Sequence, residues 1–175
     1  FILPDILMLN KFLPIRAKQI LDIGAGIGLF SLYLNHFYGS VSNISIIEVD
    51  KLSEIKYHKK EKENLILKKP LHVLDLAKDF LHKNNTFNVS FIDSNKVYNK
   101  LNKPYDLVVS LRSWGFLVDL DEYLDFVNEN LALNGTVIID INKRTIWKKK
   151  FERYFNNTKI INEYVAHHRM IGTKK

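Results

Sequence analysis

The chain has 175 residues, the size of one domain, with 46% apolar and 26% charged residues. It contains no cysteine, which excludes disulfides, a thiolate nucleophile and cysteine-based zinc sites. No apolar run reaches the roughly 18 residues of a membrane-spanning helix. The opening segment, interrupted by Pro4 and Asp5, does not resemble a signal peptide. We therefore expect a single cytoplasmic domain over 1–175, preceded by further residues because the chain starts with Phe1.

The net charge of +7 and the isoelectric point of about 9.4 have two explanations. The charge could mark a face that binds an anionic partner such as nucleic acid. However, most of it is lysine scattered along the chain, and arginine, the preferred residue for phosphate recognition, is scarce. We favour a solvated basic surface, and nucleic acid stays the less favoured partner.

Short apolar, β-branched runs alternate along the chain with longer segments of helical spacing. The predicted strands are 19–23, 44–49, 88–92, 105–111 and 136–141. The predicted helices are 29–37, 54–66, 74–83, 121–131 and 147–155. Most strand candidates are apolar at successive positions, as expected for strands buried on both faces. The alternation predicts an α/β fold with a parallel, doubly wound sheet.

The end of the chain follows a different pattern. Two β-rich runs, 159–165 and 169–173, meet at residues 166–168 with no helical segment between them. We expect this segment to form a terminal hairpin that places one antiparallel strand in the sheet.

The most informative segment joins the first predicted strand to the next helix. Residues 20–30 read Ile-Leu-Asp-Ile-Gly-Ala-Gly-Ile-Gly-Leu-Phe. Glycines at this spacing let the backbone turn tightly and approach a ligand where helix N–H groups point outward. A dinucleotide-binding loop needs glycine at position 29, where Leu29 stands. Asp22, just before the loop, would repel a pyrophosphate but suits a ligand that carries an ammonium group.

This loop resembles motif I of the class I S-adenosylmethionine-dependent methyltransferases. Further landmarks follow in that family's order: Glu48 ends the second strand, Asp93 follows the third, and 105–110 and 133–139 resemble the fourth and fifth. The resemblance covers 20–142. It implies a Rossmann-like fold with S-adenosylmethionine as cofactor and S-adenosylhomocysteine as product. The cofactor-binding residues that it implies are Asp22, Gly24, Ala25, Gly26, Gly28, Glu48, Val49, Asp93, Ser94 and Ser110.

Within this resemblance, Glu48 would accept hydrogen bonds from the ribose hydroxyls, and Asp93 would face the adenine amino group. Two alternatives remain open at this stage. Asp50 is a weaker candidate for the ribose position. Asp75 would take the place of Asp93 if the third strand were 71–74.

The segment after the fourth strand, 111–116, is expected on the acceptor side, because ligands of open α/β sheets lie beyond the carboxyl ends of strands. It lacks the Asn or Asp signature of family members that methylate base amines, and the acidic ligand of metal-dependent members. We therefore expect no metal and transfer to a hydroxyl. The segment resembles sugar O-methyltransferases, so Arg112 is expected to bind an acceptor anion and Trp114 to stack on a sugar. A surface ion pair and a core aromatic are the respective alternatives.

No residue stands out as the general base. Asp119 and Asp140 lie near strand ends and His167 and His168 near the hairpin turn, but each is more readily structural. The predicted function is an S-adenosylmethionine-dependent methyltransferase acting on a hydroxyl of a small or sugar-type acceptor. The alternatives are an RNA methyltransferase and a non-catalytic binding module of the same fold. The oligomeric state stays open.

Overall fold

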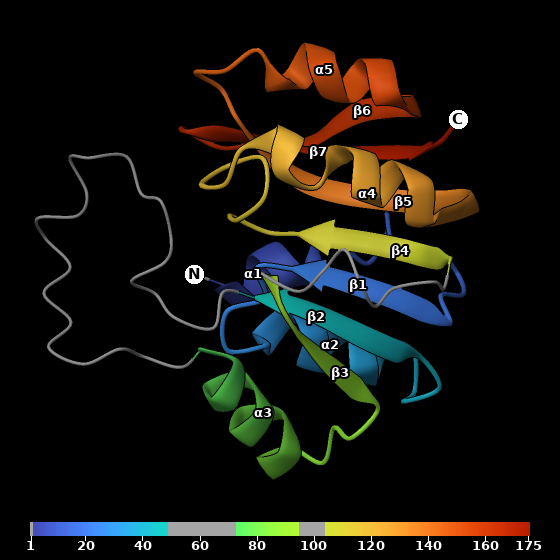
Figure 1. Cartoon of the computed structure of the whole chain (residues 1–175), viewed down its shortest axis with the longest axis vertical. Helices are drawn as coiled ribbons and strands as arrows, with labels where there is room; N and C mark the ends of the chain where they lie inside the picture. The colour runs from blue at the N-terminus through green and yellow to red at the C-terminus, as the bar shows by residue number, and fades with distance from the viewer. Residues whose placement is uncertain (1, 49–72, 95–103) are drawn as a thin grey trace, which may run out of the picture.

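The computed structural model describes residues 2–48, 73–94 and 104–175. These residues form one seven-stranded sheet with the strand order β3-β2-β1-β4-β5-β7-β6 (Figure 1). The strands are β1 Gln19–Ile23, β2 Asn43–Glu48, β3 Val89–Asp93, β4 Tyr105–Ser110, β5 Leu131–Asn142, β6 Phe155–Glu163 and β7 His167–Lys174. The helices are α1 Ile2–Leu7, α2 Leu29–Phe37, α3 Val73–Lys83, the 3-10 helix η4 Leu120–Glu122, α4 Leu124–Asn130 and α5 Trp147–Tyr154.

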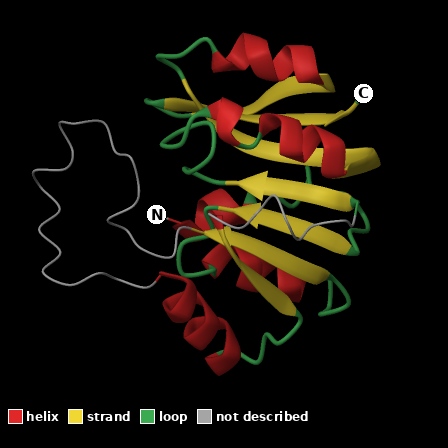
Figure 2. Ribbon diagram, viewed as in Figure 1, coloured by secondary structure: helices red, strands yellow, loops and turns green. Residues whose placement is uncertain are grey.

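Helices cover both faces of the sheet, as Figure 2 shows. Side chains of α4 and α5 pack with one hydrophobic cluster, and those of α1, α2 and α3 pack with the other. The strands supply both clusters alternately: Ile20 of β1 joins the cluster of α2, whereas Leu21 joins that of α4. This alternation explains why the sequence is apolar at successive strand positions, and it confirms the predicted doubly wound fold.

Strands β1 to β5 pair in parallel, and β7 runs antiparallel to both of its neighbours. The predicted terminal hairpin is therefore confirmed, but its turn lies earlier than expected. The backbone N–H of Tyr164 donates to the carbonyl of His167 at 2.9 Å, so Val165 and Ala166 form the turn and His167 already belongs to β7.

The boundary between α4 and β5 differs from the prediction. Asn134 and Gly135 were expected to stop a helix spanning 121–131 and to precede a strand at 136–141. Instead the helix is split, because Tyr123 has a non-helical φ of −125°, and β5 begins at Leu131. Leu131 pairs with Tyr105 of β4, and the register is irregular between Tyr105 and Leu107.

Two other predictions concern the region before β3. The alternative third strand at 71–74 is wrong, because Val73 and Leu74 begin α3, so Asp75 lies in a helix. Strand β3 at Val89–Asp93 leaves Asp93 at the strand end. The predicted helix at 54–66, together with Val49 and Asp50, lies outside the described residues.

Candidate cofactor and acceptor site

The parallel register brings three predicted residues to one edge of the sheet. Glu48 of β2 pairs with Asp93 of β3, and both are half-buried. Ile23 pairs with Ile47, and the N–H of Gly24 donates to the carbonyl of Ile47 at 2.7 Å. Gly24, Glu48 and Asp93 therefore share the carboxyl edge, the place where open α/β sheets bind ligands.

The glycine loop at this edge is fixed to the end of β2. The N–H of Gly26 donates to Oε2 of Glu48 at 2.7 Å, a bond strengthened by the carboxylate charge. Gly26 has a φ of +57°, and a Cβ added there would meet no atom within 4 Å. At Gly24, φ is +71° and an added Cβ would lie 1.8 Å from Oγ of Ser113. Gly24 is thus required by close packing, whereas the backbone at Gly26 borders open space beside Glu48.

The third glycine of the loop has a packing role. Gly28 precedes α2 and its N–H donates to the carbonyl of Ala25 at 3.0 Å. A Cβ on Gly28 would lie 2.9 Å from Cδ1 of Leu81, a residue of α3. A direct ligand contact of Ala25 or Gly28 stays a prediction.

Asp22 lies beneath the loop. Its side chain is 2% exposed, and Oδ2 accepts a hydrogen bond from Oγ of Ser31 in α2 at 2.7 Å. Burial raises the pKa of Asp22 to about 7; the bond from Ser31 opposes this shift, and the charge of Glu48 adds to it. Asp22 therefore links β1 to α2, and its predicted contact with the cofactor stays a prediction, as do those of Asp93 and the half-buried Ser94.

Two residues predicted to contact ligands, Ser110 and Trp114, lie at and after the end of β4. Ser110 is fully buried; its hydroxyl donates to the carbonyl of Ile23 at 2.8 Å and accepts from the N–H of Trp114 at 2.9 Å. Trp114 is also fully buried, and its indole N–H donates to the carbonyl of Leu120 at 2.7 Å. The indole belongs to the core under α4, so the expectation that Trp114 stacks on a ligand is wrong. A cofactor contact of Ser110 stays a prediction.

The burial of Trp114 leads to a stability prediction. We expect Trp114→Phe to lower the free energy of unfolding by about 1–3 kcal/mol, because the carbonyl of Leu120 loses its buried donor. Urea denaturation measures this change. Trp147, which is only partly buried, offers a matched control in Trp147→Phe, for which we expect a smaller loss. An unchanged stability of Trp114→Phe would show that the indole bond contributes nothing.

Arg112 adopts a left-handed conformation, with a φ of +60°, and its backbone N–H donates to Oδ2 of Asp140 at 3.1 Å. Its side chain is 54% exposed, and Nη2 lies 3.5 Å from Oδ2 of Asp5 in α1. The alternative of a surface ion pair is therefore observed. Asp5 offsets the charge that the predicted anion site requires, and acceptor binding by Arg112 stays a prediction.

Sequence reasoning considered Asp140 and His167 singly but missed Arg169 and the buried polar cluster that the three form beside Arg112. Arg169 of β7 donates from Nε and Nη2 to Oδ1 and Oδ2 of Asp140 in β5, at 2.7 and 2.9 Å, and both side chains are almost fully buried. His167 is 5% exposed and its Nε2 lies 3.4 Å from Oδ2 of Asp140. The sequence held one signal for this cluster. Asp140 is a charged residue within the apolar run 137–141, and Arg169 is a charged residue within the last predicted strand.

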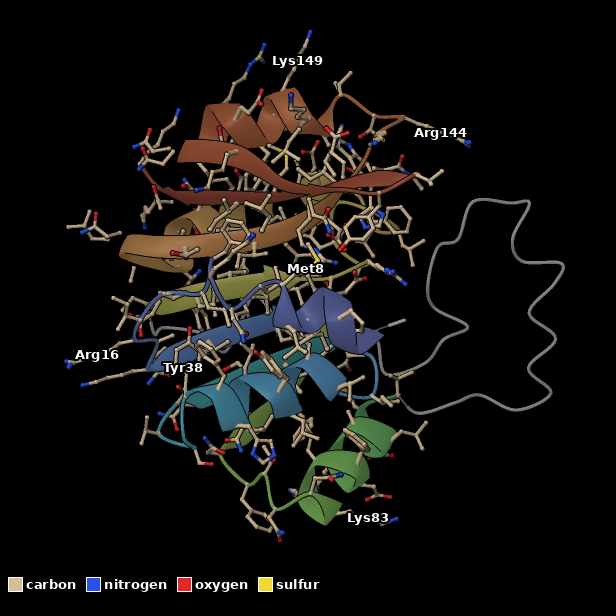
Figure 3. All side chains as sticks on the ribbon, turned by 180° about the vertical axis from the view of Figure 1, so that it is seen from behind. Met8, Arg16, Tyr38, Lys83, Arg144 and Lys149 are labelled. Atoms are coloured by element: carbon tan, nitrogen blue, oxygen red, sulfur yellow. The ribbon has the colours of Figure 1, made fainter. Side chains whose placement is uncertain are left out.

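Some of the described basic residues lie far apart, whereas three lysines follow one another in α5. Figure 3 shows Arg16, Lys83, Arg144 and Lys149 pointing outward at separate places. In the described parts of the chain, no three or more His, Asp or Glu side chains are grouped so that they could hold a metal ion. No helix within those same parts is long and apolar enough to cross a membrane.

Comparison with known proteins identifies the class of protein to which this fold, with its glycine loop at the carboxyl edge of the sheet, belongs. The sequence pattern of a family described as methyltransferase domain matches residues 5–170. The chain therefore belongs to the methyltransferase domain family. No curated protein sequence gives a significant match.

Solved structures of methyltransferases share the fold. A methyltransferase from Pyrococcus furiosus is 18% identical with a TM-score of 0.67, and the match covers 98% of this chain and 82% of that one. A Thermotoga maritima SAM-dependent O-methyltransferase is 15% identical with a TM-score of 0.68, covering 98% and 64%. The Thermus thermophilus 16S rRNA N2 methyltransferase, in complex with AdoMet and guanosine, is 15% identical with a TM-score of 0.70, covering 97% and 42%. The chain thus spans less than half of that rRNA methyltransferase.

These findings confirm the predicted family and fold. S-adenosylmethionine, around which the cofactor site was predicted, is the methyl donor of this family. The solved neighbours include enzymes for different acceptors, so the likeness does not identify the acceptor of this chain.

Proposed function

We propose that the chain is an S-adenosylmethionine-dependent methyltransferase that methylates a hydroxyl group of a small acceptor. The observation that supports it most is the glycine loop bonded to Glu48, with open space over Gly26 at the carboxyl edge. S-adenosylmethionine, when bound, supplies an electrophilic methyl group. The remaining task of the protein is to align an acceptor with it and to take up a proton.

The residues at this edge fit the chemistry of that cofactor. The carboxylate of Glu48 can accept hydrogen bonds from two ribose hydroxyls, and the backbone at Gly26 leaves room beside it. Asp93 and Ser94, at the end of the neighbouring strand, add acceptors suited to an adenine amino group. Asp22, beneath the loop, would favour an ammonium group in its ionised form.

The acceptor is proposed to be a hydroxyl because the segment 111–116 lacks the residue pattern of amine-methylating family members. A sugar acceptor has lost its main support, since Trp114 is buried. An RNA acceptor is supported by the net charge of +7 and by the fold shared with an rRNA methyltransferase. The four basic side chains labelled in Figure 3 lie at separate places, which does not add to that support.

Cofactor selectivity is the first test of this function. We expect isothermal titration calorimetry to show binding of S-adenosylmethionine and S-adenosylhomocysteine and no binding of NAD, because Asp22 stands before a loop without the third dinucleotide-type glycine. Heat from NAD, with none from either adenosyl compound, would contradict the cofactor assignment.

Glu48→Ala tests the ribose position. We expect it to weaken S-adenosylhomocysteine binding by about 2–4 kcal/mol, or about 30- to 1,000-fold, since charge-assisted hydrogen bonds are lost together with the tie to Gly26. Calorimetry measures the change, and Asp50→Ala should have a much smaller effect. If Asp50→Ala had the larger effect, the position assigned to Glu48 would be off by two residues.

The acceptor class can be found with a defined panel. Labelled methyl transfer from S-adenosylmethionine is measured onto phenol, methyl glucoside and an rRNA transcript. We expect turnover on a small hydroxyl compound. Methylation of the transcript alone would replace the proposed acceptor by RNA, and binding of the cofactor without any transfer would favour a binding module.

A further inference from the structure

Three loops converge beyond the carboxyl ends of β4, β5 and β6. The N–H of Asn142, at the end of β5, donates to the carbonyl of Gly115 at 2.9 Å, and that of Lys143 donates to the carbonyl of Ala166 at 3.1 Å. These bonds connect the loop after β4, the end of β5 and the hairpin turn. Asp140 and Arg169 pair with each other two residues before this edge of the sheet. His167 lies at the edge itself, paired with Asn142.

The strand register relates this place to the glycine loop. Asp22 lies level with Val109 in β4, which is level with Ile138 in β5, and Ile138 faces Ile171 in β7. Two residues farther toward the carboxyl edge, Gly24, Asp140 and Arg169 share one level. His167 lies two residues beyond Arg169, at the sheet edge. At the usual strand spacing, β7 stands about 14 Å from β1, so the glycine loop and His167 lie along the same edge of the sheet.

The imidazole of His167 lies between aromatic rings. Its ring stacks on Tyr164 at a centroid distance of 4.3 Å, and Phe116 lies 5.0 Å away. The side chain is 6% exposed, yet its buried Nε2 makes no hydrogen bond with a described residue. Buried polar atoms are normally satisfied, so an unsatisfied imidazole in a buried setting points to a missing partner or to a catalytic role.

We propose that His167 is the general base of this methyltransferase, and that it accepts the proton of a neutral hydroxyl carried on an aromatic or apolar body. This inference rests on the methyltransferase function proposed above. As the acceptor O–H bond breaks, its proton moves to the imidazole. The acceptor oxygen forms a bond to the methyl carbon of S-adenosylmethionine, and the carbon–sulfur bond breaks with its electron pair on sulfur. The imidazolium then returns its proton to water.

The charges around His167 support a neutral acceptor. The charged and titratable groups that face it come from five elements: Asp5 of α1, Arg112 after β4, Asp140 of β5, Tyr164 of the hairpin turn and Arg169 of β7. The two carboxylates balance the two guanidiniums, which leaves little excess charge for an anion. Burial lowers the pKa of His167; Arg169 and Arg112 lower it further, while Asp140 and Asp5 oppose the shift. The ring is therefore neutral at pH 7 and free to accept a proton.

The three loops carry exposed aliphatic side chains as well as charged ones. Exposed aliphatic side chains lie on each of the three loops: Leu117 after β4, Ile146 after β5 and Val165 in the hairpin turn. Together with the rings of Phe116 and Tyr164, these residues suit a flat or apolar body better than a sugar.

His167→Gln is the variant that tests the base, and His168→Gln is its matched control. His168 is the next residue of the same strand and is 19% exposed; its Nδ1 also makes no hydrogen bond and lies 3.8 Å from Glu163. Each variant is compared with wild type on phenol, which must lose a proton, and on 4-nitrophenol, which is already ionised at mildly alkaline pH. We expect His167→Gln to lower kcat on phenol by about 100- to 10,000-fold and to affect 4-nitrophenol far less. Calorimetric affinity for S-adenosylhomocysteine should change less than about 2-fold, and His168→Gln should match wild type.

Equal losses on both phenols, or no loss, would overturn the proposal. A second readout does not need turnover: histidine-selective NMR of the S-adenosylhomocysteine complex, titrated with phenol. We expect the His167 signals to shift and those of His168 to stay, and an unchanged His167 overturns the acceptor site. If wild type methylates only another member of the panel, the neutral aromatic acceptor is wrong. If it binds no adenosyl compound, the underlying function fails instead.

Discussion

Asp140→Ala should lower the free energy of unfolding by about 3–5 kcal/mol, measured by chemical denaturation. The carboxylate of Asp140 is fully buried and accepts two hydrogen bonds from Arg169 and one from the backbone of Arg112. Its removal leaves the guanidinium of Arg169, which is 2% exposed, without its anion. A buried unpaired charge is costly, so most of the loss comes from Arg169 and not from the missing attraction.

The double variant Asp140→Leu, Arg169→Met separates these two effects. It removes both charges and keeps apolar volume between β5 and β7, so we expect it to recover more than half of the stability lost by Asp140→Ala. The N–H of Arg112 remains without its acceptor and accounts for the rest. Asp125→Ala, at an exposed carboxylate that accepts from the hydroxyl of Tyr154, is the control and should cost about 0.5 kcal/mol or less. A double variant as unstable as Asp140→Ala would contradict this explanation.

Asp22→Asn should stabilise the ligand-free domain at neutral and alkaline pH. The pKa of Asp22 is raised from 3.8 to about 7, so between these values the folded state holds a proton that the unfolded state has released. Stability is therefore lost as pH rises from about 4 to about 7 and is level above that range. The full shift corresponds to about 4 kcal/mol. Asparagine carries no charge and can still accept a hydrogen bond from Ser31.

The difference in unfolding free energy between Asp22→Asn and wild type is the quantity to measure as a function of pH. We expect it to be near zero at about pH 4 and to grow to its full size by about pH 8. A difference that does not vary with pH would mean that Asp22 is ionised in the folded chain throughout. If the carboxylate of Asp22 attracts the ammonium group of S-adenosylmethionine, Asp22→Asn should also bind this compound more weakly. The variant would then combine a loss of function with a gain in stability.

Local sequence signals predicted the elements that depend on local physics. The strand 19–23 and the helix 29–37 agree with β1 and α2 to the residue. An apolar β-branched run followed by glycines leaves little choice of structure at this point. The same segment, with Glu48 at the end of the next strand, carried the prediction of the cofactor edge, because parallel strands bring their carboxyl ends together.

Signals that compete with long-range pairing gave wrong boundaries. Asn134 and Gly135 form a turn signal by themselves, yet they lie within β5 because Leu131 pairs with Tyr105 of β4. The hairpin turn likewise lies at Val165 and Ala166, where the pairing of β6 with β7 places it.

The sequence by itself determined the doubly wound fold, the glycine loop and the acidic residue beside it, since each rests on spacing along the chain. The tertiary structure decided which polar and aromatic side chains face the site. Trp114 follows a strand in a short loop, and nothing local distinguishes a ligand platform from a core residue until Leu120 and α4 are packed against it. His167 and Asp140 are 27 residues apart, and only the antiparallel insertion of β7 beside β5 places a buried imidazole against that carboxylate.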